Sequence, residues 1–361
     1  ENTKMLNFRK IITIGLVSTI TTIGFASTSN VSRMTNSSLL GLSTYSPTSP
    51  SMAPLSTGNG NSYYFEAHDV DKKICYDTFF GDCHHQKNIL GDVIKVNKNG
   101  KVTRVLNDWF ASGQQPTIAA IGNGFFVVVT TTQDAHALQG YVVQVVESKG
   151  HFNIKKLDSV NLGRGLNPSV ASMGNGYFMV TSSNDNNITG EHFLAAYVFK
   201  ATESQIYTPE YMNTYADGAL SEISYLGNGQ FLETNNTTNG IEYNLLDTKD
   251  NQIVAKRLNI VGDDQTLSNQ EYTSVKLIPT GQTGNYGNQQ YLQVFTLAGQ
   301  KGMYSKLLEV KEDNVYTTNS YQFAFSGEYP IAVPFQANKY LEVDINKIIG
   351  SETGLYASIL S

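Results

Sequence analysis

The chain has 361 residues, a formal net charge of −6, and 16 % charged against 40 % hydrophobic residues. This balance is typical of a globular protein and excludes a disordered one. The 25 lysine and arginine residues form no evident cluster, which disfavours nucleic acid as a partner because a phosphate-binding surface needs concentrated positive charge.

Residues 1–26 are expected to be a signal peptide. Arg9 and Lys10 precede an apolar run over residues 11–25, and Gly24-Phe25-Ala26 offers small residues where a signal peptidase cleaves. The run is shorter than the roughly 20 residues of a spanning helix and is diluted by Ser and Thr, so no membrane span is expected after signal removal. A retained anchor is the alternative. We therefore expect a secreted or periplasmic protein, of bacterial origin.

Residues 27–57 are rich in Ser, Thr and Pro and show no sustained periodicity. This composition indicates a linker between the signal peptide and the folded domain. Residues 39–45 are the one part of it that is apolar enough to form a strand.

A motif centred on Gly-Asn-Gly organises the rest of the chain. It reads PSVASMGNGYFMVT over residues 168–181, PTIAAIGNGFFVVVT over residues 116–130 and SEISYLGNGQFLET over residues 221–234. Asn-Gly between two short apolar runs is a strong hairpin signal, because a type I′ turn needs positive φ at both central residues. The runs are too short for helices. The motif therefore predicts a β-hairpin.

The turn asparagine recurs along the chain at intervals of 64, 52, 53, 60 and 50 residues. Periods of this size indicate a repeat architecture. The six positions are Asn59, Asn123, Asn175, Asn228, Asn288 and Asn338.

Each turn is followed by an aromatic-led strand and then by a third strand, and five of the six units continue into a fourth. A third strand is expected over residues 90–96, 141–146, 193–199, 241–246, 303–310 and 355–360. A fourth is expected over residues 102–106, 152–160, 205–211, 253–261 and 315–323. Four strands per unit of this length make a β-propeller blade, so the sequence predicts an all-β fold, a propeller of six four-stranded blades.

The sixth unit reaches Ser361 after only three strands. A blade with an open outer side would leave a bare strand edge. The apolar segment at residues 39–45 is therefore expected to supply the missing outer strand and to close the ring.

Over residues 58–361, which we assign to the propeller, the chain resembles secreted bacterial β-propeller repeat proteins. The resemblance is one of architecture. The kelch pattern, the WD dipeptide signature and the sialidase Asp-box are absent from the sequence, so no particular family is indicated. A pair of stacked sheets is the alternative arrangement.

In a propeller, the loops between second and third strands share one face with the loops between blades. Binding residues tend to concentrate on loops that a rigid scaffold holds. The residues expected to hold a ligand on this face are His68, Trp109, Asp134, His136, Arg164, Glu191, His192, Tyr215 and Asp217. Of the histidines, His68, His136 and His192 suit metal or acid–base chemistry, but solvated loop histidines explain them equally simply.

Cys75 and Cys83 are the two cysteines of the sequence. In an exported protein they are expected to form a disulfide. Metal binding together with His84 and His85 is the alternative, although the spacing matches no zinc pattern. No cofactor and no metal site is expected; the Asn- and Asp-rich residues 184–187 could offer oxygen ligands to calcium or another divalent ion.

No nucleophile or metallohydrolase motif occurs in the sequence, since G-x-S-x-G, H-E-x-x-H and the P-loop are all missing. The expected function is therefore that of an exported, monomeric binding module that holds a protein or glycan on one propeller face. The 21 tyrosines fit a contact surface. The alternative is a propeller hydrolase or lactonase with a metal or carboxylate site at the channel mouth, for which Asp134, His136, Glu191 and His192 are the candidates.

Overall fold

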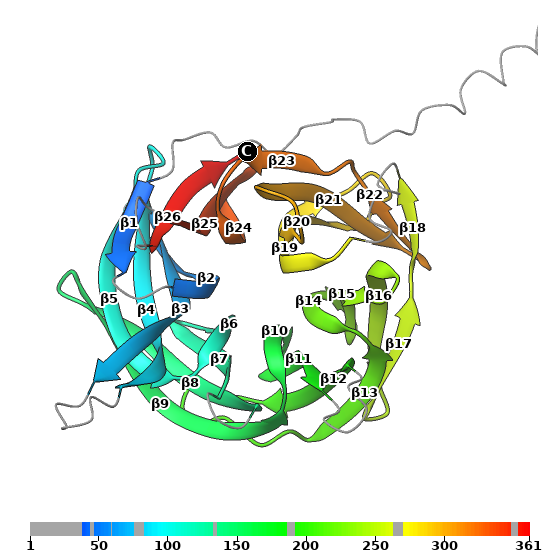
Figure 1. Cartoon of the computed structure of the whole chain (residues 1–361), viewed down its shortest axis with the longest axis horizontal. Coiled ribbons are helices and arrows are strands. Elements are labelled where there is room, and N and C mark those ends of the chain that lie inside the picture. Colours follow the sequence, from blue (N-terminus) through cyan, green and yellow to red (C-terminus); the bar gives the residue numbers. More distant parts are fainter. Residues whose placement is uncertain are drawn as a thin grey trace, which may run out of the picture.

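The computed structural model describes residues 38–43, 47–58, 60–75, 83–132, 136–185, 192–262, 270–347 and 353–361. Within these ranges the regular elements are strands, and no helix is long and apolar enough to cross a membrane. Six antiparallel sheets stand around a central axis, which confirms the six-bladed β-propeller (Figure 1).

The first four blades each contain four strands, ordered from the channel outward along the chain. Blade 1 contains β2 (Pro47–Gly58), β3 (Asn61–Cys75), β4 (Cys83–Asn97) and β5 (Val102–Ser112). Blade 2 contains β6 (Gln114–Gly122), β7 (Phe125–Thr131), β8 (Ala137–Ser148) and β9 (His151–Arg164). Blade 3 contains β10 (Leu166–Gly174), β11 (Tyr177–Asp185), β12 (His192–Lys200) and β13 (Tyr211–Asp217). Blade 4 contains β14 (Ala219–Gly227), β15 (Gln230–Thr237), β16 (Gly240–Lys249) and β17 (Gln252–Arg257).

The last two blades depart from this simple order. Blade 5 contains β19 (Tyr272–Thr283), β20 (Gln289–Leu297), β21 (Met303–Lys311), β22 (Asn314–Thr317) and β23 (Tyr321–Ala324), and β18 (Asn259–Gly262) joins it by pairing in parallel with β22. Blade 6 contains β24 (Glu328–Gln336), β25 (Lys339–Lys347), β26 (Thr353–Leu360) and β1 (Ser38–Ser43).

The three Gly-Asn-Gly copies form the hairpin turns that the sequence predicts. Asn123 and Gly124 have φ values of 51° and 81°, and the corresponding pairs at Asn175 and Asn228 are also positive at both positions. Blade 5 is different, because Thr283 pairs with Gln289 and leaves Asn288 inside a longer loop. Asn59 lies outside the described residues.

Several fourth strands differ from their predicted bounds. The predicted strand over residues 253–261 divides at Leu258, so that β17 stays on blade 4 while β18 crosses to the outer strand of blade 5. Residues 315–323 likewise divide into β22 and β23, which both pair with β21. In blade 3 the outer strand begins only at Tyr211, because a tight turn ends in a bridge between Ala201 and Ile206.

The predicted closure of the ring is confirmed. Strand β1 pairs antiparallel with β26, from Ser38 opposite Ala357 to Ser43 opposite Thr353. Residues 47–57, which the sequence assigns to a linker, instead form most of β2, the innermost strand of blade 1. Residues 1–26, the expected signal peptide, lie outside the described residues.

The hydrophobic core is divided among the spaces between blades. Within the described residues, one buried apolar cluster fills each of the six junctions between neighbouring sheets. Between blades 1 and 2, for example, the rings of Phe65 and Phe126 lie 5.0 Å apart. This packing makes each blade depend on its neighbours for burial of both faces.

We expect Leu40→Ala to reduce the free energy of unfolding by about 2 kcal/mol, the lower end of the range for a buried leucine. Leu40 is 8 % exposed and belongs to the cluster between blades 6 and 1. Leu157→Ala is the matched control, since Leu157 lies on the outer strand β9 with 41 % exposure. Urea denaturation of the two variants measures the difference, and equal stabilities would show that the closing strand contributes nothing.

Candidate functional site

The innermost strands begin with an unusual backbone feature at the mouth of the channel away from the Asn-Gly turns. In five of the six blades a residue other than glycine takes φ values between 46° and 54° there, and the pairing register shifts at the same point. These residues are Ser49, Gln115, Asn167, Leu220 and Tyr329. A left-handed conformation costs ~1–2 kcal/mol for an L-residue, and bulges of this kind redirect a side chain.

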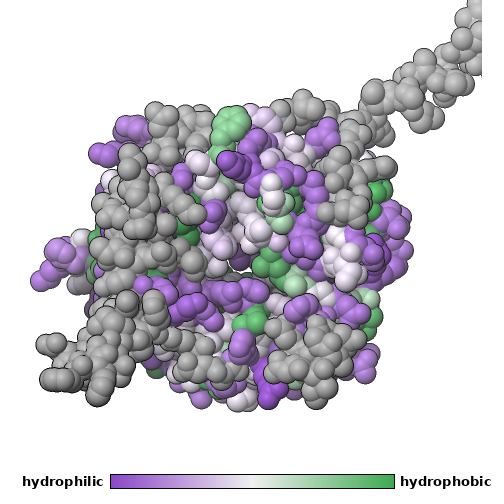
Figure 2. Space-filling model, in the orientation of Figure 1, coloured by the Kyte–Doolittle hydropathy of each residue, from purple (hydrophilic) through white to green (hydrophobic). Residues whose placement is uncertain are grey.

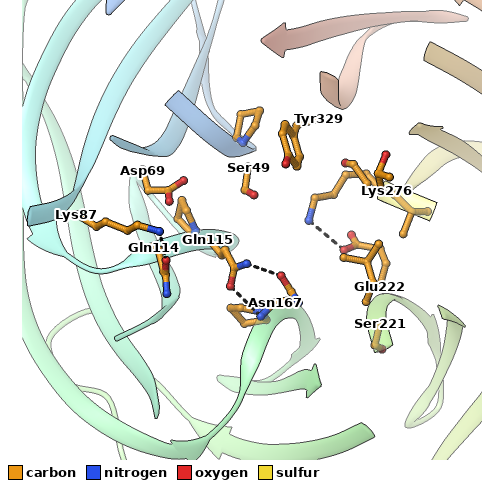
Figure 3. A pocket seen from close by; sticks show the side chains of 17 residues that line it. Ser49, Asp69, Lys87, Gln114, Gln115, Asn167, Ser221, Glu222, Lys276 and Tyr329 are labelled. Carbon is orange, nitrogen blue, oxygen red and sulfur yellow. Dashed lines mark hydrogen bonds and ion pairs between the residues drawn. The ribbon is translucent and has the colours of Figure 1, made fainter. Parts of the chain in front are cut away.

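These bulges surround a cavity of about 310 Å³ at the channel mouth. All six blades contribute to its lining, and the centre of the face drawn in Figure 2 is hollowed, with hydrophilic and hydrophobic side chains at its rim. Figure 3 shows the side chains that reach into this mouth pocket. The labelled polar ones are Ser49, Asp69, Lys87, Gln114, Gln115, Asn167, Ser221, Glu222, Lys276 and Tyr329.

Two amides from neighbouring blades hold each other at one side of the mouth pocket (Figure 3). Gln115 Nε2 donates to Asn167 Oδ1 at 2.5 Å, and the Asn167 backbone N–H donates back to Gln115 Oε1 at 3.0 Å. The hydroxyl of Thr131 also donates to Gln115 Oε1, at 3.2 Å. The amide of Asn167 donates in turn to the hydroxyl of Ser183 at 3.4 Å, so this arrangement fixes both side chains.

A repeated hydrogen bond joins neighbouring innermost strands. Its acceptor lies two residues after the left-handed residue of the bulge. A hydroxyl from one blade accepts from a backbone N–H of the next blade: Ser51 from Ile118 at 3.0 Å, Thr117 from Val170 at 3.2 Å, and Ser169 from Ile223 at 3.1 Å. The register with the second strands places these three residues at equivalent positions.

Glu222 and Lys276 occupy the same position in blades 4 and 5. The Glu222 carboxylate accepts from the backbone of Leu277, as the hydroxyls do in the earlier blades, and it also pairs with Lys276 Nζ at 3.0 Å. Burial raises the pKa of Glu222, and the nearby ammonium of Lys276 opposes that shift. The position that holds a hydrogen-bonding hydroxyl in blades 1 to 3 therefore holds a charged residue in blades 4 and 5, and these two residues form an ion pair at the channel (Figure 3).

A buried polar network lies beside the mouth pocket between blades 3 and 4. Ser221, which lines the pocket, donates to Glu233 Oε1 at 2.9 Å, and the hydroxyl of Tyr215 donates to the same oxygen at 3.3 Å. Asn235 and Asn244 donate to this carboxylate as well. Burial raises the pKa of Glu233 to about 7 despite these donors. Tyr215 is therefore half-buried, its hydroxyl supports this network, and it does not line the mouth pocket.

A second buried cluster occupies the space between blades 1 and 6. His68 Nδ1 lies 2.9 Å from Glu66 Oε2, and Asp92 lies opposite Glu66 on β4. One potential ligand atom from each of the three lies within 4.8 Å of the others, close enough to hold one cation. Arg104 approaches Asp92 at 3.5 Å and Asn107 donates to it at 2.5 Å. A protonated His68 together with Arg104 therefore balances the two carboxylates without an ion.

The remaining expected site residues do not gather at the mouth pocket. Trp109 is 43 % exposed on the outer strand β5. His136 and Arg164 are exposed at the junction of blades 2 and 3, where their carbonyls accept from Gly165 and from the Tyr197 hydroxyl.

His192 and Asp217 are exposed at neighbouring ends of β12 and β13, where the Gly218 N–H donates to the His192 carbonyl at 3.2 Å. Asp134 and Glu191 lie outside the described residues. Hence none of the nine residues that were chosen from the sequence, so far as the structure describes them, lines the mouth pocket.

One sequence signal could have located the pocket. Four of the five left-handed residues stand directly before a proline: Ser49-Pro50, Gln115-Pro116, Asn167-Pro168 and Tyr329-Pro330. Each dipeptide precedes an Asn-containing turn by a similar distance, so it repeats with the blades.

The predicted disulfide is compatible with the backbone. Cys75 and Cys83 are partners in the antiparallel ladder of β3 and β4, and opposed Cα atoms in such ladders lie ~4.5–5.5 Å apart, within the range that a disulfide spans. Their side chains, and those of His84 and His85, lie outside the described residues.

Mass spectrometry of the unreduced protein after alkylation tests this disulfide. We expect neither cysteine to take up the label until a reductant is added, because the pair is joined. Labelling of both thiols in the untreated protein would contradict the disulfide.

The comparisons with known proteins show the fold alone. No protein-family model and no curated protein matches the chain. Among solved structures, a protein of unknown function from Dyadobacter fermentans is 10 % identical with a TM-score of 0.53, covering 92 % of this chain and 99 % of that one. A sialidase of Trypanosoma rangeli, solved with the inhibitor DANA, is 10 % identical with a TM-score of 0.51; 92 % of this chain matches 58 % of the sialidase. An alpha-L-arabinofuranosidase of Fusarium graminearum, solved with arabinobiose, is 10 % identical with a TM-score of 0.52, covering 91 % of this chain and 97 % of that one.

The ion pair of His68 and Glu66 predicts a pH dependence of stability. Burial alone would lower the pKa of His68, but the carboxylate of Glu66, helped by Asp92 and Asp69, raises it to about 9. A histidine whose pKa rises on folding adds stability that is complete below its unfolded pKa of about 6.5 and is lost as the pH passes through the folded value. We therefore expect His68→Gln to destabilise the protein at about pH 6, and the deficit to shrink toward about pH 10.

The matched control is His151→Gln, since His151 is exposed at the start of β9. Urea denaturation of both variants across this pH range gives the comparison. A deficit of His68→Gln that stays constant with pH would mean that the imidazole acts only by packing.

Proposed function

We propose that this protein is an exported binding module whose mouth pocket holds a segment of a glycan. The observation that carries the proposal is the set of left-handed residues that the innermost strands place around one cavity. Backbone strain of this kind persists where the surrounding structure enforces it, and it gathers at functional sites. Export rests on the basic and apolar character of residues 5–26.

The chemistry of the pocket suits a polyhydroxylated ligand. Sugar hydroxyl groups both donate and accept hydrogen bonds, and the amides of Gln114, Gln115 and Asn167 offer both functions from fixed positions. Tyr329 adds an aromatic side chain with an apolar body and a polar tip. The charged groups Glu222 and Lys276 neutralise each other, and the opposite charges of Asp69 and Lys87 also sum to zero, so the pocket does not require a charged ligand.

The size of the pocket favours a glycan segment over a protein surface. A specific protein interface buries on the order of 1,000 Å² or more of combined surface, whereas this site is a concave cavity of about 310 Å³. A sialidase and an arabinofuranosidase, whose names give sugar substrates, share the fold. That likeness adds support only at the level of architecture.

One observation favours a glycoside hydrolase as the second candidate. Asp69 and Glu222 lie on opposite sides of the same pocket (Figure 3). Two carboxyl groups that flank a bound sugar are the usual catalytic pair, and the one with the raised pKa serves as general acid. Burial raises the pKa of Glu222, but its contacts with Lys276 and the Leu277 backbone already occupy it.

A panel of immobilised neutral and acidic oligosaccharides, probed with the purified protein, tests the proposed function. Gln115→Ala and Asn167→Ala should each weaken binding about ten-fold, the effect of losing one or two hydrogen bonds. Asn153→Ala is the control, because Asn153 is exposed on β9 and does not line the pocket. Binding that survives both pocket substitutions would place the ligand elsewhere.

The same preparations separate the two candidates. Release of reducing sugar over time, abolished by Glu222→Gln, would establish the hydrolase. Stable capture of the oligosaccharide without product supports the binding module.

A further inference from the structure

A second cavity lies next to the mouth pocket along the channel, toward the Asn-Gly turns. Its volume is about 580 Å³, and residues of the innermost strands β2, β6, β10, β14, β19 and β24 line it. Glu222 and Lys276 line both cavities. Their ion pair therefore stands at the boundary between the polar mouth pocket and this inner chamber.

The inner chamber differs from the mouth pocket in chemistry. Among its lining residues, Glu222 and Lys276 are the only charged ones, and most of the others are alanine, valine, leucine, isoleucine or proline. The mouth pocket, in contrast, is lined by amides and by further charged groups such as Asp69 and Lys87.

The repeat explains why the chamber is apolar. One equivalent position of each innermost strand lies opposite the aromatic residue near the start of the second strand. These six positions hold Pro54, Ala120, Ser172, Tyr225, Pro279 and Pro334, and all of them line the chamber. A proline at the free edge of a sheet carries no N–H, so half of these positions offer water no backbone donor.

An apolar space of this size is a favourable place for a ligand group. Small-molecule sites have volumes of roughly 300–1,000 Å³ and are lined mainly by apolar side chains with a few polar groups. Water in contact with such a lining is poorly held, and an apolar group that displaces it gains ~25 cal/mol for each Å² that it buries.

We infer that the inner chamber binds an alkyl or aryl group carried by the ligand of the mouth pocket. The ligand is then amphipathic: a glycan whose apolar substituent passes the Glu222–Lys276 pair. The polar half of this inference rests on the proposed function, whereas the apolar half rests on the chamber alone.

Ala120→Trp tests the chamber directly. Ala120 is exposed on β6 and lines the chamber, so an indole there fills space without displacing core residues. The probe is N-phenyl-1-naphthylamine, a neutral fluorophore that brightens in apolar sites. The wild-type protein should bind it, and Ala120→Trp should reduce its affinity about ten-fold or more.

The matched control is Ala298→Trp, since Ala298 is also exposed and lines neither cavity. It should bind the probe as the wild type does. Ser172→Trp fills the chamber from blade 3 and replaces Ala120→Trp if circular dichroism shows that the first variant does not fold. Equal probe binding by the wild type and by a folded chamber variant would overturn the inference, whatever the glycan panel shows.

The second arm compares the methyl and octyl glycosides of a sugar that the panel identifies. The octyl glycoside should bind about ten-fold tighter or more, since burial of two methylenes already suffices, and Ala120→Trp should remove that advantage. Equal affinities would overturn the inference and leave the proposed function standing. A panel without any binder, combined with probe binding that Ala120→Trp abolishes, would overturn the proposed function and leave the apolar chamber standing.

Discussion

Hydrogen bonds that join the innermost strands of blades 2, 3 and 4 to the preceding blade fix the geometry of that part of the channel. The free edge of an innermost strand faces the channel, and an unpaired N–H there would have no partner from its own sheet. The hydroxyls of Ser51, Thr117 and Ser169 supply that partner across three blade junctions. Because these bonds set the spacing of the inner strands, they also set the width of both cavities.

The charged pair at the channel is a variation on this contact. Glu222 keeps the acceptor role toward the Leu277 backbone and gains Lys276 as a second partner. A carboxylate side chain is longer than a hydroxyl side chain, so this position brings charge to the channel while it keeps the contact that the fold requires. The two cavities meet at this place, which gives the channel a polar section and an apolar section.

The sequence predicts the fold well because the fold is repeated. Asn123-Gly124 and its two copies mark hairpins by turn chemistry alone, and the shortfall of one strand after residue 355 predicts the partnership of β1 and β26. Local patterns carry this information because turn geometry and strand periodicity are local properties. The pairing of β18 with β22 was not predictable in this way, since nothing in the sequence of residues 259–262 indicates a partner strand on another blade.

The candidate site was harder to predict for a physical reason. From the sequence, residues were selected by their chemical type, which favours histidine, tryptophan and acidic residues. Of these, His68 is buried between blades and Trp109 lies on the outside of the molecule. The pocket instead uses ordinary residues such as Gln115, Asn167 and Tyr329, whose direction depends on a bulge in the backbone. Side-chain direction at a bulge is a three-dimensional property. The recurring dipeptide with proline in second place is the one sequence pattern that marks these bulges.

The pairing of β1 with β26 joins the beginning of the propeller to its end. Their bounds, Ser38–Ser43 and Thr353–Leu360, place the two strands at opposite ends of the described residues. Contacts between such distant segments form slowly, because the intervening chain must be ordered first. Blades 2 to 4 can assemble from neighbouring segments of sequence, whereas blade 6 combines segments from both ends of the propeller. We therefore expect closure of the ring between β1 and β26 to be a late step of folding.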